Sequence, residues 1–215
     1  MEINIRDGYR NHYKYEEVQC GNVSIRGIIK ASGWFPGRKE LLLVIDGVEH
    51  PIRPSNAAIL FHWGPIFRFS LPEGDIEVRQ SFRADRIRLD CPQLGTHLIL
   101  QCPNDFFGRR KCKEVLLFQD NQPVIYSIQK AKEFVKGKGR RSNLPEDEEA
   151  EEELIGLEHE SFRRGRSFIF TTGIRLADPD SILSTTLNML TFYQLYWNNL
   201  ANKRDTINAL TLYFP

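Results

Sequence analysis

The fold is decided by residues 181–202, SILSTTLNMLTFYQLYWNNLAN, a stretch without a single charged residue. Apolar side chains recur along it at the three- and four-residue spacing of an α-helix, among them Leu183, Leu190 and Trp197. Nearly half of the stretch is Ser, Thr, Asn or Gln, which is too polar for a helix that crosses a membrane. A helix with no charges has to be buried on most sides. We therefore expect one long core or interface helix near the C-terminus.

The residues on both sides of this stretch predict where the helix begins and how the chain returns to a sheet. Asp178-Pro179 supplies a capping side chain followed by proline at the first helical position. Lys203-Arg204 places positive charge at the negative end of the helix dipole. The apolar segments Ser167–Phe170 and Ile207–Phe214 predict strands before and after the helix. Residues 167–215 are thus expected to form a strand–helix–strand unit.

Residues 1–129 show the period-two alternation of short strands separated by turn residues, clearest in Val23–Ala31. Asp46-Gly47 predicts a tight hairpin, because both central residues of a type I′ turn need positive φ. Strands are also predicted over Val48–Arg53 and Val124–Ile128. We expect an α+β fold that is mainly antiparallel β, sandwich or barrel-like, with one long uncharged C-terminal helix and a charged insertion.

The insertion is the segment Lys130–Arg166, in which the charge is basic, then acidic, then basic again. A helix from Pro145 to about Phe162 would place acids at its positive end and arginines at its negative end. A solvated acidic loop explains the same composition. Because strands are expected on both sides of it, the insertion belongs to a single domain, residues 1–215, between the β-rich segment 1–129 and the C-terminal unit.

The overall charge excludes a binding mode that depends on the field of the whole molecule. The chain has 29 Lys and Arg against 28 Asp and Glu, so any electrostatic function has to be local. The N-terminal residues carry charge from Glu2 onward and lack the apolar segment of a secretory signal. No window has the apolar length that a membrane-spanning helix needs. We expect a cytoplasmic or otherwise intracellular protein with reduced cysteines and no membrane partner.

The leading candidate binding residues are the basic side chains of the insertion. They are Lys130, Lys132, Lys136, Lys138, Arg140, Arg141, Arg163, Arg164 and Arg166. Lysines and arginines spaced by glycine can contact several phosphates, which predicts salt-dependent binding of low sequence specificity. The alternative is that they pair with the acidic stretch 146–160, in the same molecule or in a neighbouring one.

Two further groups of residues have simpler structural explanations. Cys91, His97, Cys102 and Cys112 are ligand types that zinc accepts, but no two of them have the close spacing of a zinc turn. Buried thiols, and no metal site, are therefore the expectation. His62-Trp63 suits either the lining of a ligand pocket or a corner of the core.

A metal-dependent nuclease or hydrolase is the weakest of the functional alternatives. Asp75, Glu77 and Arg79 fall on one face of a predicted strand, where two carboxylates could hold a metal ion. Arginine is a poor substitute for a catalytic lysine, and a solvated polar face alternating with Ile76 and Val78 accounts for the same residues. The sequence has no phosphate loop, nucleophile elbow or dinucleotide fingerprint.

Together these patterns lead to the hypothesis of a non-enzymatic interaction or assembly module. It would bind another protein, or itself, through its segregated charge and its uncharged helix, without a cofactor. Nucleic-acid binding through the basic run 130–141 is the alternative hypothesis.

Overall fold

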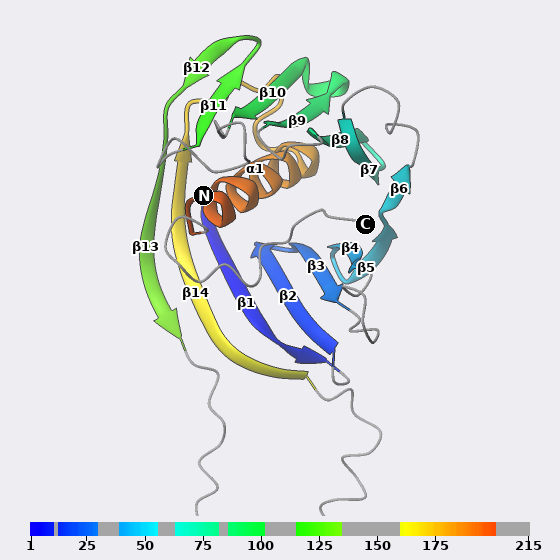
Figure 1. Ribbon diagram of the computed structural model, residues 1–215, viewed down its shortest axis with the longest axis vertical. Coiled ribbons are helices and arrows are strands. Elements are labelled where there is room, and N and C mark those ends of the chain that lie inside the picture. Colours follow the sequence, from blue (N-terminus) through cyan, green and yellow to red (C-terminus); the bar gives the residue numbers. More distant parts are fainter. Residues whose placement is uncertain are drawn as a thin grey trace, which may run out of the picture.

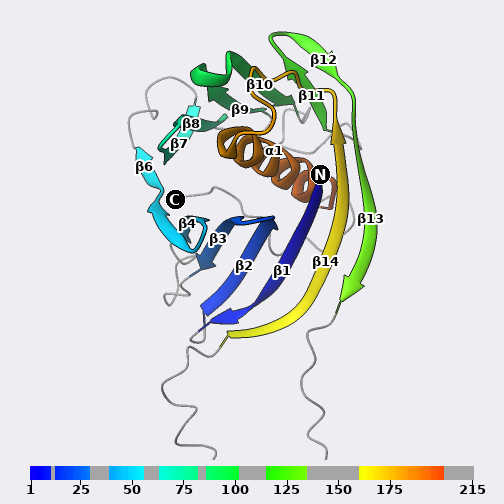
Figure 2. The same ribbon diagram turned by 180° about the vertical axis from the view of Figure 1, so that it is seen from behind.

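The computed structural model describes residues 1–10, 13–29, 39–55, 63–81, 86–101, 115–134 and 160–200. In these residues the chain forms two seven-stranded antiparallel sheets and one long helix, α1 (Ile182–Leu200). Figures 1 and 2 show α1 lying between the two sheets. The expected α+β fold, mainly antiparallel with one C-terminal helix, is confirmed, and it consists of two sheets and not a closed barrel.

The first sheet has the order β13-β14-β1-β2-β3-β4-β5. Its strands are β1 (Glu2–Arg10), β2 (Tyr13–Cys20), β3 (Val23–Ile29), β4 (Lys39–Ile45), β5 (Val48–Pro51), β13 (Tyr126–Phe134) and β14 (Glu160–Thr172). The second sheet has the order β12-β11-β10-β9-β8-β7-β6. Its strands are β6 (Arg53–Ser55), β7 (Trp63–Leu71), β8 (Gly74–Ser81), β9 (Arg86–Cys91), β10 (Thr96–Gln101), β11 (Leu116–Gln119) and β12 (Gln122–Val124).

Two hairpins follow directly from their turn residues. Asp46 and Gly47, with φ of 50° and 80°, connect β4 to β5, which confirms the predicted tight turn. Asp120 and Asn121, with φ of 48° and 65°, connect β11 to β12 in the same way. Positive φ at both central residues matches the twist of the paired strands, so these short turns set the register of each hairpin.

The chain passes between the sheets at two corners that the sequence does not reveal. The predicted strand Val48–Arg53 is divided at Ile52, with β5 in the first sheet and β6 in the second. The predicted strand Val124–Ile128 is divided in the same way at Ile125, between β12 and β13. Both predictions of a single strand are wrong, because the direction of the chain at each corner is set by which sheet offers pairing partners.

Helix α1 starts later than predicted, with a different cap. The hydroxyl of Ser181 accepts a hydrogen bond from the backbone N–H of Ser184 at 3.1 Å, so Ser181 is the N-cap. Asp178-Pro179 precedes the helix, and the carbonyl oxygen of Asp178 accepts a hydrogen bond from the Ser181 hydroxyl at 3.0 Å. A carboxylate from another region of the chain adds to this end, since Leu183 N–H donates to Glu73 Oε2 at 3.2 Å.

The core surrounds α1, as its lack of charge predicted. The helix contacts β2 and β3 of the first sheet and β8 and β9 of the second. Its buried apolar residues are Leu183, Leu187, Met189, Leu190, Phe192, Tyr193, Leu195 and Tyr196. The ring of Phe192 lies 5.5 Å from that of Phe170 and 5.7 Å from that of Phe168, both on β14. Within the described ranges, no helix combines the length and the hydropathy needed to cross a bilayer.

The end of the helix predicted in the insertion is a strand in the structure. Glu160–Phe162 belong to β14, in which Ser161 lies opposite Tyr9 and Phe162 opposite Gly8 on β1. The prediction of a helix reaching Phe162 is therefore wrong at its end, because pairing with β1 supplies hydrogen-bond partners that local helix signals cannot anticipate. The rest of that predicted helix, and the predicted strand Ile207–Phe214, lie outside the described residues.

Candidate interaction surfaces

One face of the second sheet carries two clusters of charged side chains, around Glu77 and around Asp90, and we call it the second-sheet face. Strand alternation creates it, because the neighbouring apolar residues point to the core. The buried residues are Phe67, Phe69, Ile76, Val78, Ile87, Leu89, Leu98 and Leu100. The residues between them face outward and include Arg68, Glu77, Arg79, Arg86, Arg88, Asp90, His97, Ile99 and Gln101.

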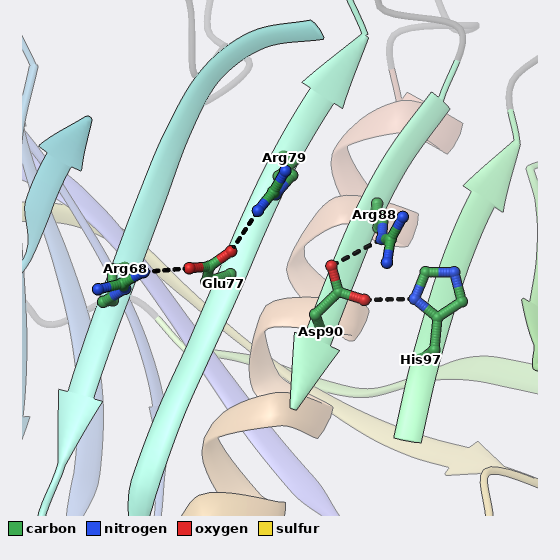
Figure 3. Close-up of polar contacts among 6 residues, drawn as sticks. All are labelled: Arg68, Glu77, Arg79, Arg88, Asp90 and His97. Carbon is green, nitrogen blue, oxygen red and sulfur yellow. Dashed lines mark hydrogen bonds and ion pairs between the residues drawn. The ribbon is translucent and has the colours of Figure 1, made fainter. Parts of the chain in front are cut away.

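Glu77 lies between two arginines at one end of this face (Figure 3). Its Oε2 accepts a hydrogen bond from Arg79 at 2.7 Å, and its Oε1 accepts one from Arg68 on β7. These two bonds, that of Arg79 first, hold the pKa of the Glu77 carboxyl below its ordinary value of 4.5. Both carboxylate oxygens are thus engaged by cations.

Asp90 on β9 forms a second, similar cluster (Figure 3). Its Oδ2 accepts a hydrogen bond from Nε of Arg88 at 2.6 Å, and its Oδ1 contacts Nδ1 of His97 on β10. The two terminal amino groups of Arg88 make no further contact with the described residues. Arg88 therefore uses one donor on Asp90 and keeps its outer donors available.

The strand register places like charges opposite each other. Arg79 lies directly opposite Arg88, and Glu77 lies directly opposite Asp90. Like charges in opposed positions are destabilising, and here the bonds along each strand, Arg79 to Glu77 and Arg88 to Asp90, offset that repulsion. The Nε atom of Arg79 is buried without a hydrogen-bond partner among the described residues. The charge is therefore segregated into an acidic row and a basic row.

A hollow of about 320 Å³ lies beside the basic row. It is lined by Arg86, Arg88, Ile99, Gln101, Phe118 and Asn121. Ile99 lies opposite both Arg88 on β9 and Phe118 on β11, so arginine, aliphatic and aromatic side chains follow one another across three strands. The lining residues that the structure describes include two arginines and two amides but no acid, which suits an anionic ligand with a flat apolar group.

The second surface is formed by β13 and β14, which we call the basic hairpin. The strand pairing brings the two basic segments of the sequence together, since Glu133 lies opposite Arg166 and Phe134 opposite Gly165. Arg163 and Arg164 lie on the same strand as Arg166. Lys136, Lys138, Arg140 and Arg141 lie outside the described residues.

The described basic side chains of the hairpin each have a local partner. Lys130 forms an ion pair with Glu133, and both are about half exposed, at 51% and 50%. Lys132 lies 3.7 Å from Glu2 and is 64% exposed. Arg166 donates a hydrogen bond to the hydroxyl of Tyr196 on α1 at 2.8 Å. Exposed pairs of this kind contribute little to stability, so the lysines remain available to a competing anion.

The remaining candidate residues do not converge on one site. Cys91 is buried against the core, whereas His97 lies on the opposite face of the same sheet, so the two cannot bind one ion. Cys102, Cys112 and His62 lie outside the described residues, and Trp63 begins β7 opposite Ser81. Among the residues that the structure describes, no three His, Cys, Asp or Glu side chains gather as a metal site would require.

Sequence reasoning found only some of the second-sheet face. It placed Asp75, Glu77 and Arg79 on one strand face, and these residues do alternate with the buried Ile76 and Val78. It missed the partners on β7, β9 and β10. Alternation within RIRLDC, residues 86–91, was a usable signal for two outward arginines and an aspartate. The register between strands, which makes them partners, has no local signal.

Comparison with protein-family models, curated proteins and solved structures found no match to this chain.

Proposed function

We propose that this protein is a non-enzymatic interaction or assembly module that binds a second copy of itself along the basic hairpin. The observation that supports this is the position of β13 at the edge of the first sheet. Among the described strands, β13 pairs only with β14, so the other side of its backbone offers donors and acceptors to an added strand. β13 contains no proline that would remove a donor.

Charge favours an acidic occupant of this edge. Lys130 and Lys132 project from β13 with at least half of each side chain exposed. The sequence itself contains a complementary segment, the acidic stretch 146–160. We infer that this stretch of one molecule docks on the basic hairpin of another, which gives association that weakens as salt screens the charges.

Helix α1 contributes to this function only indirectly. The hypothesis from the sequence used the uncharged helix as a second docking surface, but from Leu183 to Tyr196 its surface packs largely in the chain's own core. Among the described residues, it contacts the hairpin through the hydrogen bond from Arg166 to Tyr196 and through the rings of Phe168 and Phe170 on β14, which pack against Phe192. The proposal therefore depends on the charged hairpin alone.

Sedimentation velocity at several protein and salt concentrations tests the proposal. We expect association at low salt that is lost at high salt, and a Lys130→Glu/Lys132→Glu variant that stays monomeric under the same conditions. Arg175→Glu, a charge reversal at an exposed position outside the hairpin, is the control and should associate like the wild type. A wild-type protein that is monomeric at every concentration and binds no partner in a pull-down would refute the proposal.

Nucleic-acid binding is the second candidate, and the pairing of β13 with β14 favours it. This pairing places residues from both basic segments on one hairpin. Several adjacent cations of this kind would neutralise several phosphates and release counterions. Replacing Lys130, Lys132, Lys136, Lys138, Arg140 and Arg141 by Ala should flatten the dependence of binding on salt. A wild-type chain that binds neither single- nor double-stranded oligonucleotides at low salt rules the candidate out.

A further inference from the structure

We propose that the hollow on the second-sheet face is a binding site for a nucleoside phosphate. Its phosphate would lie against Arg86 and Arg88, and its base against Phe118 and Ile99. This site is separate from the basic hairpin, since it lies on the other sheet, and it does not depend on the function proposed above.

The distribution of charge along β9 directs an anion to one end of the face. Within this strand Asp90, Arg88 and Arg86 follow one another on the outward side. The acidic row, Glu77 and Asp90, lies on one side of Arg88, and Arg86 lies on the other. An anion at the hollow therefore meets Arg88 of the basic row first, and the described carboxylates, Glu77 and Asp90, lie one row further away.

Arg88 has the donors that a phosphate needs. Its contact with Asp90 is made through Nε, which fixes the guanidinium plane and leaves the two terminal amino groups for another acceptor. With 42% of its side chain exposed, it is accessible from solution. Arg79 directly opposite adds a second cation to the row. Guanidinium groups bind phosphate oxygens with short, charge-assisted hydrogen bonds.

The rest of the lining matches a base better than a peptide carboxylate. Phe118 is half-buried next to Ile99, so the two side chains offer a flat apolar platform at the side of the arginines. Gln101 and Asn121 contribute amide groups at the hollow, and amides can donate to and accept from the edge of a base. An acidic peptide would use the arginines but would leave the platform and the amides without a role. The volume, about 320 Å³, is near the lower end of the range of small-ligand sites, roughly 300–1,000 Å³.

Binding measurements with four probes test this site. The probes are adenosine 5′-monophosphate, inorganic phosphate, a fluorescein-labelled short oligoadenylate and a polyglutamate peptide. We expect the mononucleotide to bind at least about tenfold more tightly than inorganic phosphate, because stacking adds to the charge contact. If the oligoadenylate binds more tightly still, the natural ligand is a nucleotide within a single strand. If it does not, the ligand is a free nucleotide.

Three variants separate the contributions of charge and stacking. Arg88→Gln should weaken mononucleotide binding about tenfold or more through the loss of charge-assisted bonds. Phe118→Leu keeps an apolar side chain but removes the ring, and it should bring the mononucleotide affinity close to that of inorganic phosphate. Arg68→Gln removes an arginine from the same face outside the hollow, and it should leave binding within about twofold of the wild type because of screening over distance.

Circular dichroism and urea unfolding establish that each variant is folded before binding is compared. The proposal is overturned if neither nucleotide probe binds more tightly than inorganic phosphate at low salt. Equal weakening by Arg88→Gln and Arg68→Gln would also overturn it, since binding would then follow net charge alone. A polyglutamate peptide that binds more tightly than the mononucleotide, with the same sensitivity to Arg88→Gln, would assign the surface to an acidic protein instead.

Discussion

At the scale of single residues, alternation decides which side chains of the second-sheet face point outward, and register decides which of them meet. Alternation places Arg68, Glu77 and Arg79 outside because their neighbours in sequence are needed in the core. Register then brings Arg68 opposite Glu77, where the two form an ion pair. Because Arg68 is half-exposed, its pair with Glu77 orients the two side chains more than it stabilises the fold.

The lowered pKa of Glu77 predicts a specific dependence of stability on pH. Because the pKa of the carboxyl is lower in the folded chain than its ordinary value of 4.5, its ion pairs stabilise the protein fully above that value. This contribution is lost as the pH falls through the folded-state pKa. We expect Glu77→Gln to unfold more easily than the wild type at neutral pH, with a difference that shrinks in acid.

Urea unfolding over a series of pH values measures this difference. Glu49→Gln, the loss of one exposed carboxylate from β5 outside the second-sheet face, is the matched control. A difference between Glu77→Gln and the wild type that grows as the pH falls would contradict the sign of the pKa shift.

At the scale of elements, the start of α1 is held by side chains and not by helix propensity. Its first turn contains Ile182, Ser184 and Thr185, and β-branched residues and serine favour helix formation only weakly. Ser181, the residue directly before the helix, caps it, and Glu73 in the turn between β7 and β8 accepts a second hydrogen bond from its first turn. The bond to Glu73 also holds the start of α1 against the second sheet, so capping this helix depends on a tertiary contact.

Removing the cap should weaken the whole fold by a modest amount. We expect Ser181→Ala to cost about 1 kcal/mol in the free energy of unfolding, which corresponds to a fall of about 2–4 °C in Tm for a chain of this size. Ser181→Thr keeps a hydroxyl at the capping position and should retain most of the stability. Thermal unfolding followed by circular dichroism gives both values, and equal losses for Ala and Thr would show that the hydroxyl is not the cap.

At the scale of the whole molecule, α1 is the element that joins the two sheets. It contacts strands of both, and its ring cluster around Phe192 includes Phe168 and Phe170 of β14 and Tyr196 of the helix itself. The covalent corners at Ile52 and Ile125 connect the same two sheets at their edges. We therefore expect the two sheets to unfold together.

Phe192→Ala tests this dependence. Loss of a fully buried aromatic side chain should cost about 3–5 kcal/mol and increase hydrogen exchange in both sheets. Exchange measured by mass spectrometry on peptides from β1–β3 and from β8–β9 separates the two sheets. Phe192→Leu, which keeps most of the apolar volume, should have a smaller effect on both. Faster exchange in one sheet alone would mean that α1 belongs to that sheet only.

The sequence by itself determined the local features of this protein. Alternation predicted the strands, Asp46-Gly47 predicted its turn, and the absence of charge between Ser181 and Leu200 predicted a buried helix. Each of these follows from interactions between residues close in the chain or from the cost of burying charge.

Only the tertiary structure decided which strands pair. The pairing in turn decides which side chains meet across neighbouring strands. The division of one predicted strand at Ile125, the extended conformation of Glu160–Phe162, and the row of Arg79 beside Arg88 all depend on partners distant in sequence. Strand pairing satisfies backbone hydrogen bonds with whichever segment the fold places alongside, and a local pattern carries no information about that segment. The hollow beside Arg88 exists for the same reason, since its lining comes from β9, β10 and the β11–β12 hairpin.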